Sequence, residues 1–214
     1  NKKVFFKKKC MHYSVQNLKN IKNLINDKLN HLKKSESPKI IAVSKTFPID
    51  QINPLIESGH LDFGENKVQE ALEKWSEIKF KNEKIRLHLI GRLQTNKVKY
   101  AVKIFDYIHS VDSEKLAKKI SDELNKNKRK IKIFIQVNIG QENQKSGVDI
   151  KNLENLYLFC KKINLEVIGL MCIPPAETNS EQYFKKMQDL NKNFNLKELS
   201  MGMSSDYLKA VEYS

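Results

Sequence analysis

Short apolar runs alternate with amphipathic stretches along most of the chain. Residues 14–32 carry apolar side chains at every third or fourth position, which predicts a first helix with Ser14 as its N-cap. Beyond it, seven apolar runs are each followed by a stretch with helical spacing. The predicted strands are residues 39–44, 61–64, 87–90, 107–111, 131–138, 165–171 and 197–201, and the predicted helices are residues 50–58, 66–75, 94–103, 113–125, 149–163, 180–193 and 205–212.

This alternation predicts an α/β fold with a parallel sheet, for which two closures exist. An open, doubly wound sheet carries a glycine-rich phosphate turn after its first strand, but Ser44-Lys-Thr-Phe-Pro48 contains no glycine. A (β/α)8 TIM barrel places its chemistry at the carboxyl ends of many strands. Polar or glycine-containing segments follow nearly every predicted strand, so the pattern favours the barrel, although it supplies seven strands and not eight.

The chain of 214 residues has a formal net charge of +14, from 39 basic and 25 acidic side chains. This charge suggests nucleic-acid binding, but only three basic residues are arginine, the residue that nucleic-acid readers favour. We interpret the charge as a lysine-rich, solubilising surface and keep a basic nucleic-acid-binding protein as an alternative. Residues 1–13 are expected to form a disordered basic extension.

Several classes of protein are excluded by what the sequence lacks. No apolar run approaches the roughly 20 residues of a transmembrane helix, and the basic start lacks the apolar core of a signal peptide. The cysteines, Cys10, Cys160 and Cys172, form no C-x-x-C pair and have no neighbouring histidine cluster. Neither a disulfide framework nor a metal site is therefore expected, and we predict a cytoplasmic protein without membrane contact.

Lys45 is the strongest single candidate for a reactive residue. It directly follows Ile40-Ile-Ala-Val43 and so lies at the end of a predicted buried strand, where we expect little water around its amine. A neutral amine is the form that condenses with an aldehyde to an imine. The alternative is that the side chain extends from the strand end to solvent, and this feature alone leaves both possibilities open.

Other candidate residues lie at other strand ends. Ser200-Met-Gly-Met-Ser204 forms either an anion-binding turn, through backbone N–H groups and serine hydroxyls, or simply a tight turn with an N-cap. Asn66 either lines the same mouth or caps the following helix. His88 and His109 stand alone and are expected to be core or supporting residues. The polar loop 143–147 either lines the mouth or is merely solvated.

Together these motifs resemble the pyridoxal phosphate homeostasis proteins, which bind pyridoxal 5′-phosphate (PLP). The resemblance runs in order and at fitting intervals from about residue 14 to the end. The matching segments are Ala42-Val-Ser-Lys-Thr46, Asp62-Phe-Gly-Glu-Asn66 with Val68-Gln-Glu70, His88-Leu-Ile-Gly-Arg-Leu-Gln-Thr-Asn-Lys97, Phe134-Ile-Gln-Val-Asn138, Lys145-Ser-Gly147, Gly169-Leu-Met171, and Leu199-Ser-Met-Gly-Met-Ser204 with Asp206.

The resemblance implies a TIM barrel of the alanine racemase N-terminal type over residues 14–214. It also implies PLP held as an imine on Lys45, with Asn66 lining the pocket. The phosphate turn would be formed by Ser200, Met201, Gly202 and Ser204. Two features depart from the family: Arg92 stands where a proline is usual, and the eighth strand with its Arg-x-Gly-Thr segment is missing. We therefore expect the barrel domain to be C-terminally truncated.

The function implied by the resemblance is intracellular PLP homeostasis. The protein would carry or buffer PLP, deliver it to PLP-dependent apo-enzymes, act as a monomer and catalyse no reaction of its own. The alternative within the same fold is a PLP-dependent amino-acid racemase. That alternative needs a second catalytic base, which racemases of this type take from an additional domain and a partner subunit, and one barrel fills this chain.

Overall fold

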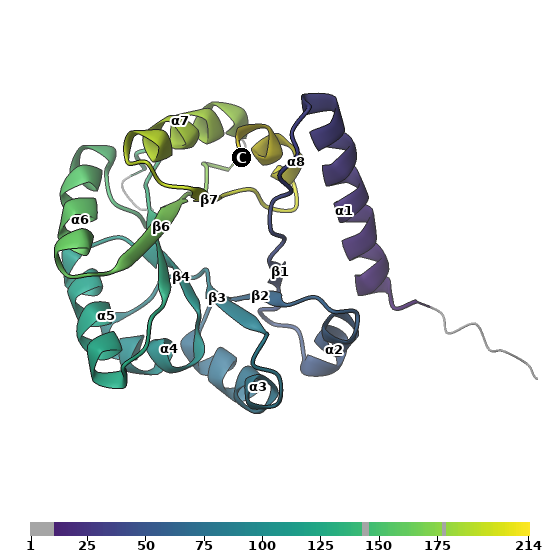
Figure 1. The fold of residues 1–214 in the computed structure, drawn as a ribbon, viewed down its shortest axis with the longest axis horizontal. Coiled ribbons are helices and arrows are strands. Elements are labelled where there is room, and N and C mark those ends of the chain that lie inside the picture. Colours follow the sequence, from purple (N-terminus) through teal and green to yellow (C-terminus); the bar gives the residue numbers. More distant parts are fainter. Residues whose placement is uncertain (1–10, 143–145, 177–178) are drawn as a thin grey trace, which may run out of the picture.

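The computed structural model describes residues 11–142, 146–176 and 179–214. Within them, a curved parallel sheet is surrounded by helices (Figure 1). The strands are β1 (Ala42–Val43), β2 (Asp62–Glu65), β3 (Arg86–Leu89), β4 (Tyr107–Val111), β5 (Lys132–Gln136), β6 (Glu166–Met171) and β7 (Glu198–Ser200). The helices are α1 (Tyr13–Leu32), α2 (Ile49–Glu57), α3 (Val68–Lys81), α4 (Val98–Ile104), α5 (Glu114–Asn127), α6 (Ile150–Lys162), α7 (Ser180–Asn193) and α8 (Tyr207–Ala210), with 3-10 turns η1 (Thr95–Lys97) and η2 (Val211–Tyr213).

The strand order distinguishes between the two closures. Each strand pairs in parallel with the next along the chain, from β1 to β7, without a reversal. A doubly wound sheet requires a point where the order reverses, so the barrel-type prediction is confirmed. The sheet is not closed, because β1 and β7 are its two edges in the described part of the chain. We call the space between these edges the β1–β7 opening.

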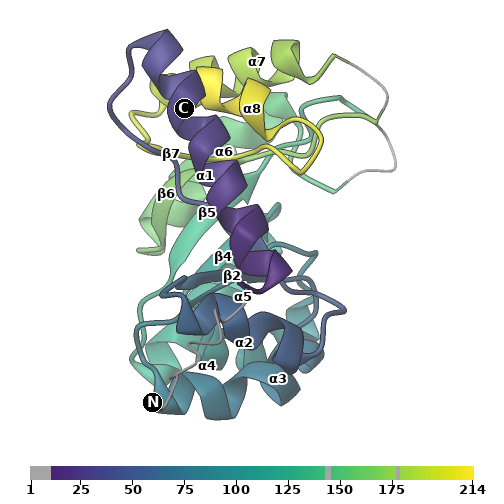
Figure 2. The same ribbon diagram turned by 90° about the vertical axis from the view of Figure 1, so that its right-hand side faces the viewer.

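Helix α1 lies across the outside of this opening (Figures 1 and 2). At one end it contacts α2, and at the other it packs on α8 and η2 through Ile25, Leu29 and Val211. The Lys34 amine donates to the backbone carbonyls of Glu212 (2.8 Å) and Ser214 (2.7 Å). Among the described residues, the two edges of the sheet are therefore linked through the helix layer and a side-chain ion pair between Lys39 and Glu198, and not through strand hydrogen bonds.

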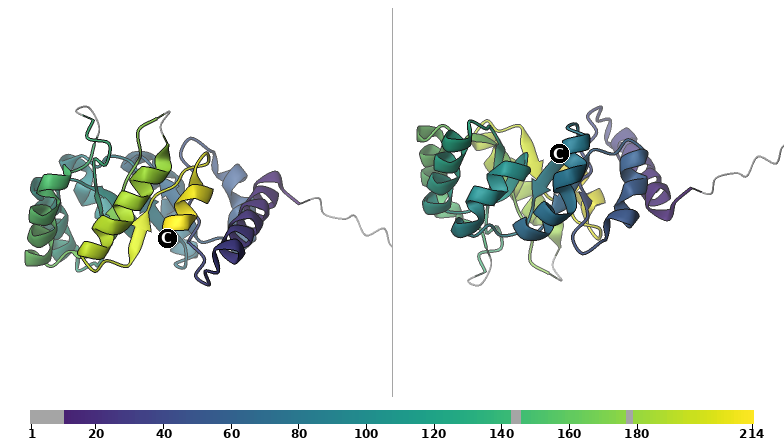
Figure 3. Two further views of the ribbon diagram at one scale, coloured as in Figure 1. Left: turned by 90° about the horizontal axis from the view of Figure 1, so that it is seen from above. Right: turned by 90° about the horizontal axis from the view of Figure 1, so that it is seen from below.

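The sheet has a large outer core and a small inner one. The outer face packs against the helices, with Phe63 and Trp75 fully buried and their rings 4.8 Å apart. Figure 3 shows this helix layer from two opposite sides, with α7 in yellow-green and α8 in yellow at the front of the left view. The inner face carries a separate cluster of Tyr107, Phe134 and Met171. None of the described helices is long and apolar enough to traverse a lipid bilayer.

Element ends differ from the predictions where local signals compete. The N-cap of α1 is His12, not Ser14, because the His12 ring accepts from the Ser14 N–H (3.4 Å). The helix begins at Tyr13, inside the predicted extension, and residues 1–10 of that extension lie outside the described residues. Strand β1 is shorter than predicted because, in the described part of the chain, it has a neighbouring strand on one side only. The last predicted helix is one short α-helical turn followed by η2.

Candidate functional site

A large cavity lies at the carboxyl ends of the strands and continues into the β1–β7 opening. Its volume is about 2010 Å³, well above the roughly 300–1,000 Å³ of common ligand pockets. Its wall includes residues 37–43 on one edge and 197–201 on the other, so the volume combines the barrel interior with the opening. All six predicted site residues line it: Lys45, Asn66, Ser200, Met201, Gly202 and Ser204.

Lys45 occupies a tight turn directly after β1. The Phe47 N–H donates to the Ser44 carbonyl (3.2 Å), which places Lys45 and Thr46 at the two central positions of the turn. Thr46 has a φ of 66°, a left-handed conformation that β-branched residues rarely adopt. Backbone strain of this kind persists only where the surroundings hold it, and it clusters at functional sites.

Ser44 attaches this turn to the rest of the fold. Its N–H donates to the Gly64 carbonyl (2.9 Å) and its hydroxyl donates to the Glu65 carboxylate (2.8 Å). The Ser44 carbonyl also accepts from the Lys74 amine (2.8 Å). Glu65 is completely buried, and the same carboxylate oxygen accepts from Lys74 (2.9 Å) and from the Trp75 indole (2.9 Å). A buried network therefore fixes the backbone from which Lys45 projects.

The Lys45 side chain itself is exposed, so the predicted lack of water around its amine is wrong. The physical reason is the position of β1 at the edge of the sheet. Among the described strands only β2 lies beside it, and the neighbouring Val43 is 44% exposed. Lys45 nevertheless faces the cavity, since it lines the same wall as Val43.

Asn66 lies on the cavity wall after β2. It does not cap α3, whose N-cap is Lys67 without a side-chain capping bond. Its backbone is in close contact with Gly91, where a Cβ would come within 2.3 Å of the Asn66 carbonyl oxygen. Of the two alternatives for Asn66, the structure therefore supports the position at the mouth.

The Ser200–Ser204 turn closes the opposite side of the cavity. Gly202 has a φ of 88°, and a Cβ there would lie 2.8 Å from the Ala210 Cβ. Glycine is therefore required both by the backbone conformation and by the contact with α8. The Met203 N–H donates to the Asp206 carboxylate (2.6 Å), which stabilises the turn. Ser200 and Gly202 are half-buried, whereas Ser204 is exposed.

A chain of buried polar side chains reaches Ser200 from inside the barrel. His109 Nδ1 lies 2.7 Å from the Ser200 hydroxyl, and His109 Nε2 lies 2.9 Å from His88 Nδ1. His88 Nε2 lies 3.1 Å from the Asp62 carboxylate. Both histidines are buried, as expected of core or supporting residues, but their contact with each other and with Ser200 was not predicted. Alternation along β3 and β4, which points both rings to the inner face, is the signal that could have suggested it.

Burial controls the charge of this chain. It lowers the pKa of His88 against the opposing effect of Asp62, and it lowers the pKa of His109 well below its ordinary value, with a further contribution from His88. Both rings are therefore neutral at pH 7. Burial alone would raise the pKa of Asp62, but hydrogen bonds from Arg86 (2.7 and 2.5 Å) and His88 outweigh it and hold that pKa well below its usual range.

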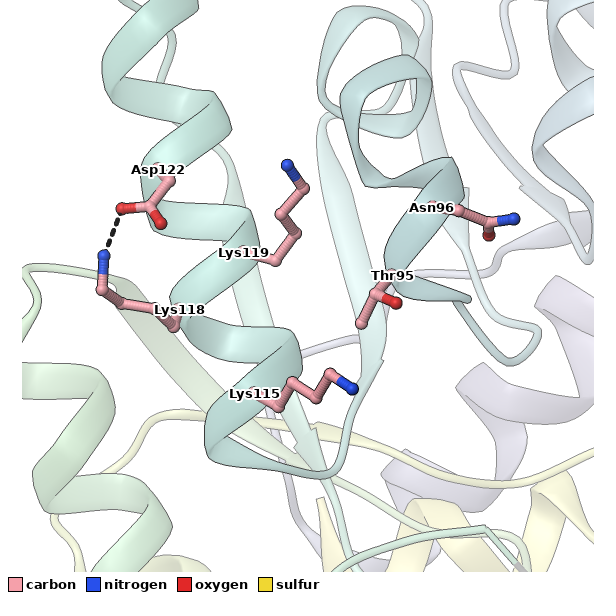
Figure 4. A pocket seen from close by; sticks show the side chains of 6 residues that line it. All are labelled: Thr95, Asn96, Lys115, Lys118, Lys119 and Asp122. Atoms are coloured by element: carbon pink, nitrogen blue, oxygen red, sulfur yellow. Dashed lines mark hydrogen bonds and ion pairs between the residues drawn. The ribbon is translucent and has the colours of Figure 1, made fainter.

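A second hollow, of about 440 Å³, lies on the helix layer between η1 and α5 (Figure 4). Three lysines of α5, Lys115, Lys118 and Lys119, line it together with Thr95, Asn96 and Asp122. Lys118 pairs with Asp122 (2.5 Å), and Lys119 pairs with Glu123 (2.7 Å). This hollow contains none of the predicted site residues and is separate from the interior cavity.

Comparison with known proteins places the chain in a family. The sequence profile of the alanine racemase N-terminal domain matches residues 16–214. The pyridoxal phosphate homeostasis protein of Aquifex aeolicus is 40% identical over 184 residues, which are 81% of this chain and 80% of that protein. The chain belongs to the pyridoxal phosphate homeostasis protein family. The family member of Escherichia coli K12 is 32% identical over 80% of this chain and 78% of its own length.

Solved structures agree with the family membership. PipY of Synechococcus elongatus PCC7942, whose structure has PLP bound, is 33% identical to this member of the family. Its TM-score is 0.76, over 88% of this chain and 93% of PipY. The alanine racemase of Clostridium difficile 630 has a TM-score of 0.69 at 16% identity and matches over 50% of its length. At that identity the likeness concerns the fold alone, which is the alanine racemase N-terminal type predicted from the motifs.

Proposed function

We propose that this chain binds PLP covalently through Lys45 and acts in PLP homeostasis by carrying or buffering the cofactor. Membership of the pyridoxal phosphate homeostasis family and the likeness to PLP-bound PipY support the choice of ligand. The observation that carries the proposal is that Lys45 and the Ser200–Ser204 turn, more than 150 residues apart in sequence, line one cavity.

The chemistry of the wall fits PLP. PLP supplies an aldehyde for an amine and a phosphate for hydrogen-bond donors, and it supplies an aromatic ring. Lys45 provides the amine, while Ser200, Ser204 and the backbone of Met201 and Gly202 provide polar groups for the phosphate. The glycine at position 202 keeps that turn clear of a side chain. Asn66 provides an amide on the same wall.

The exposure of Lys45 suits a carrier. An amine at the open mouth of a large cavity can be reached by the cofactor without a rearrangement of the fold, and the bound cofactor can leave by the same route. Delivery to PLP-dependent apo-enzymes, a monomeric state and a cytoplasmic location are part of this proposal. We infer no independent catalysis, because the relatives that support the choice of ligand are named as homeostasis proteins.

An absorbance titration with PLP tests the proposal. The parent should develop an imine band that Lys45→Ala lacks, because only position 45 has its amine on the turn after β1. Lys39→Ala is the matched control: this lysine also lines the cavity and pairs with Glu198 (3.3 Å) across the opening, and its loss should leave the band intact. An undiminished imine band in Lys45→Ala would refute the assignment.

A further experiment separates the proposed function from the racemase alternative. The PLP-loaded protein is incubated with L-alanine in deuterated water, and exchange of the α-hydrogen is followed by NMR. A homeostasis protein should show no exchange above free PLP, whereas a racemase must exchange this hydrogen. The nucleic-acid alternative is tested by binding to duplex DNA, which must weaken steeply with salt if that alternative holds.

A further inference from the structure

The polar chain Asp62–His88–His109–Ser200 fixes the position of every proton in it. Asp62 is ionised and can only accept, so His88 must carry its hydrogen on Nε2. A neutral His88 then has a bare Nδ1, which accepts from the Nε2–H of His109. A neutral His109 in turn has a bare Nδ1 and accepts the hydroxyl hydrogen of Ser200. From this order of donors and acceptors we assign the Nε2–H tautomer to both His88 and His109.

With these tautomers the Ser200 hydroxyl does not donate to an anion at the Ser200–Ser204 turn. The single hydroxyl hydrogen of Ser200 points to His109 and away from any ligand, so only oxygen lone pairs face the cavity. Lone pairs opposite a phosphate dianion repel it. Ser200 can donate to a phosphate only if His109 supplies a hydrogen to Ser200 in return.

The histidine pair can make this change by taking up one proton from solvent. His88 then holds hydrogens on both nitrogens, one donated to Asp62 and one to His109 Nε2. His109 carries its hydrogen on Nδ1 and donates it to Ser200, whose own hydrogen is released toward the cavity. The four groups hold three hydrogens before the change and four afterwards, and no heavy atom has to move between partners.

Building on the proposed function, we propose that binding of the PLP phosphate beside Ser200 is coupled to uptake of one proton by the His88–His109 pair. His88 and His109 are positioning residues here, because they act on the ligand only through Ser200. The two rings are held for this role by stacking, His88 on Tyr107 (4.2 Å between centroids) and His109 on Phe134 (4.3 Å).

The charges around the His88–His109 pair favour its protonation only when an anion is bound beside Ser200. Asp62 and Asp106 act on His88 to favour the protonated ring, and Arg86 acts against it. His109 faces His88, and burial is the main effect that keeps both neutral. The amine of Lys132 lies 5.8 Å from the centre of the Tyr107 ring, which stacks on His88. A phosphate dianion adds the negative charge that offsets burial.

Calorimetry of PLP binding at pH 7, in two buffers of different ionisation enthalpy, counts the protons taken up. The parent should take up about one proton more per PLP than Ser200→Ala, which retains Lys45 and both histidines. Titrations of the imine and of the phosphate itself are common to both proteins and cancel in the difference. Equal uptake by the two proteins overturns the proposal.

Pyridoxal, which lacks the phosphate, is the matched ligand. It can still react with Lys45, but parent and Ser200→Ala should then take up the same number of protons. A difference as large as that seen with PLP would show that the phosphate is not the trigger. Because the imine band is recorded on the same samples, a band without an extra proton overturns the coupling, whereas a band retained by Lys45→Ala overturns the proposed function instead.

A second measurement observes the histidines directly. Long-range ¹⁵N–¹H NMR should show His109 Nδ1 without hydrogen in the free protein and with hydrogen when PLP is bound. A hydrogen on Nδ1 already in the free protein overturns the assignment. The affinity of the parent for PLP should also fall by up to about tenfold more per pH unit than that of Ser200→Ala as the pH rises above the lowered pKa of the free histidine pair.

Discussion

The buried ion pair beneath the Lys45 turn is the feature whose energetic contribution can be worked out most directly. Glu65 has 0% of its side chain exposed and Lys74 has 14%, and their charged atoms are 2.9 Å apart. Replacement of Glu65 by glutamine preserves volume but removes the charge that compensates Lys74. The carboxylate oxygen Oε1 accepts from three donors, Ser44, Lys74 and Trp75, so an amide NH2 group at that place would face donors and not acceptors. We expect Glu65→Gln to be strongly destabilising.

The magnitude follows from burial. Removing one partner of a buried ion pair costs roughly 3–5 kcal/mol, because the other charge stays buried and uncompensated. Lys74 keeps 14% of its side chain in contact with solvent, so we expect the lower end, about 3 kcal/mol. For a domain of this size that loss corresponds to a fall in Tm of roughly 6–12 °C. The same substitution in the exposed pair Glu77–Lys81, at 79% and 71% exposure, should have no measurable effect.

Urea denaturation of four proteins tests this reasoning as a double-mutant cycle: the parent, Glu65→Gln, Lys74→Met and the double variant. The double variant should lose clearly less stability than the sum of the single losses, since no unpaired charge remains. Strict additivity would refute the argument, as would a Glu65→Gln variant no less stable than Glu77→Gln. Glu65→Gln should also weaken PLP binding, because Glu65 accepts from the Ser44 hydroxyl behind Lys45.

Two further predictions concern the phosphate turn and acid stability. Gly202→Ala should lower both the free energy of unfolding and the affinity for PLP. The control Gly59→Ala has nearly the same φ (87°) but no atom within 4 Å of its added Cβ, so it should cost only about 1 kcal/mol and leave PLP binding unchanged. Equal losses of stability in urea melts would contradict the role of the Ala210 contact. Burial lowers the pKa of His109, so the unfolded chain binds more protons below about pH 6.5, and stability should fall there as the pH drops, by up to about 1.4 kcal/mol per pH unit. His109→Gln should reduce this slope in urea melts across pH 5–7, and an unchanged slope would contradict the assignment.

The architecture is strongly encoded in the local pattern of the sequence. Parallel strands covered by helices have short, β-branched apolar runs as their sequence pattern, and the intervening helices have amphipathic spacing. The order of all seven strands could therefore be predicted from the sequence. The position of Lys45, Asn66 and the Ser200–Ser204 turn at one mouth also followed, because parallel strands bring their carboxyl ends to the same edge.

Local signals were weaker at element ends and at the sheet edge. Ser14 has the chemistry of an N-cap, but His12 takes that position two residues earlier. Lys45 follows an apolar run and yet is exposed, since exposure at an edge strand depends on whether a neighbour lies beside it. These outcomes depend on competition between adjacent residues or on distant parts of the fold, neither of which periodicity describes.

The proton chain belongs wholly to the tertiary structure. His88 and His109 are 21 residues apart and Ser200 lies 91 residues beyond His109, so nothing local in the sequence connects them. Curvature of the sheet turns the inner faces of β3, β4 and β7 toward one another and brings the three side chains within hydrogen-bond distance. The sequence by itself determined which elements form and at which ends the chemistry lies. The curvature of the sheet decided which side chains meet, because hydrogen bonds depend on distances in space that only packing sets.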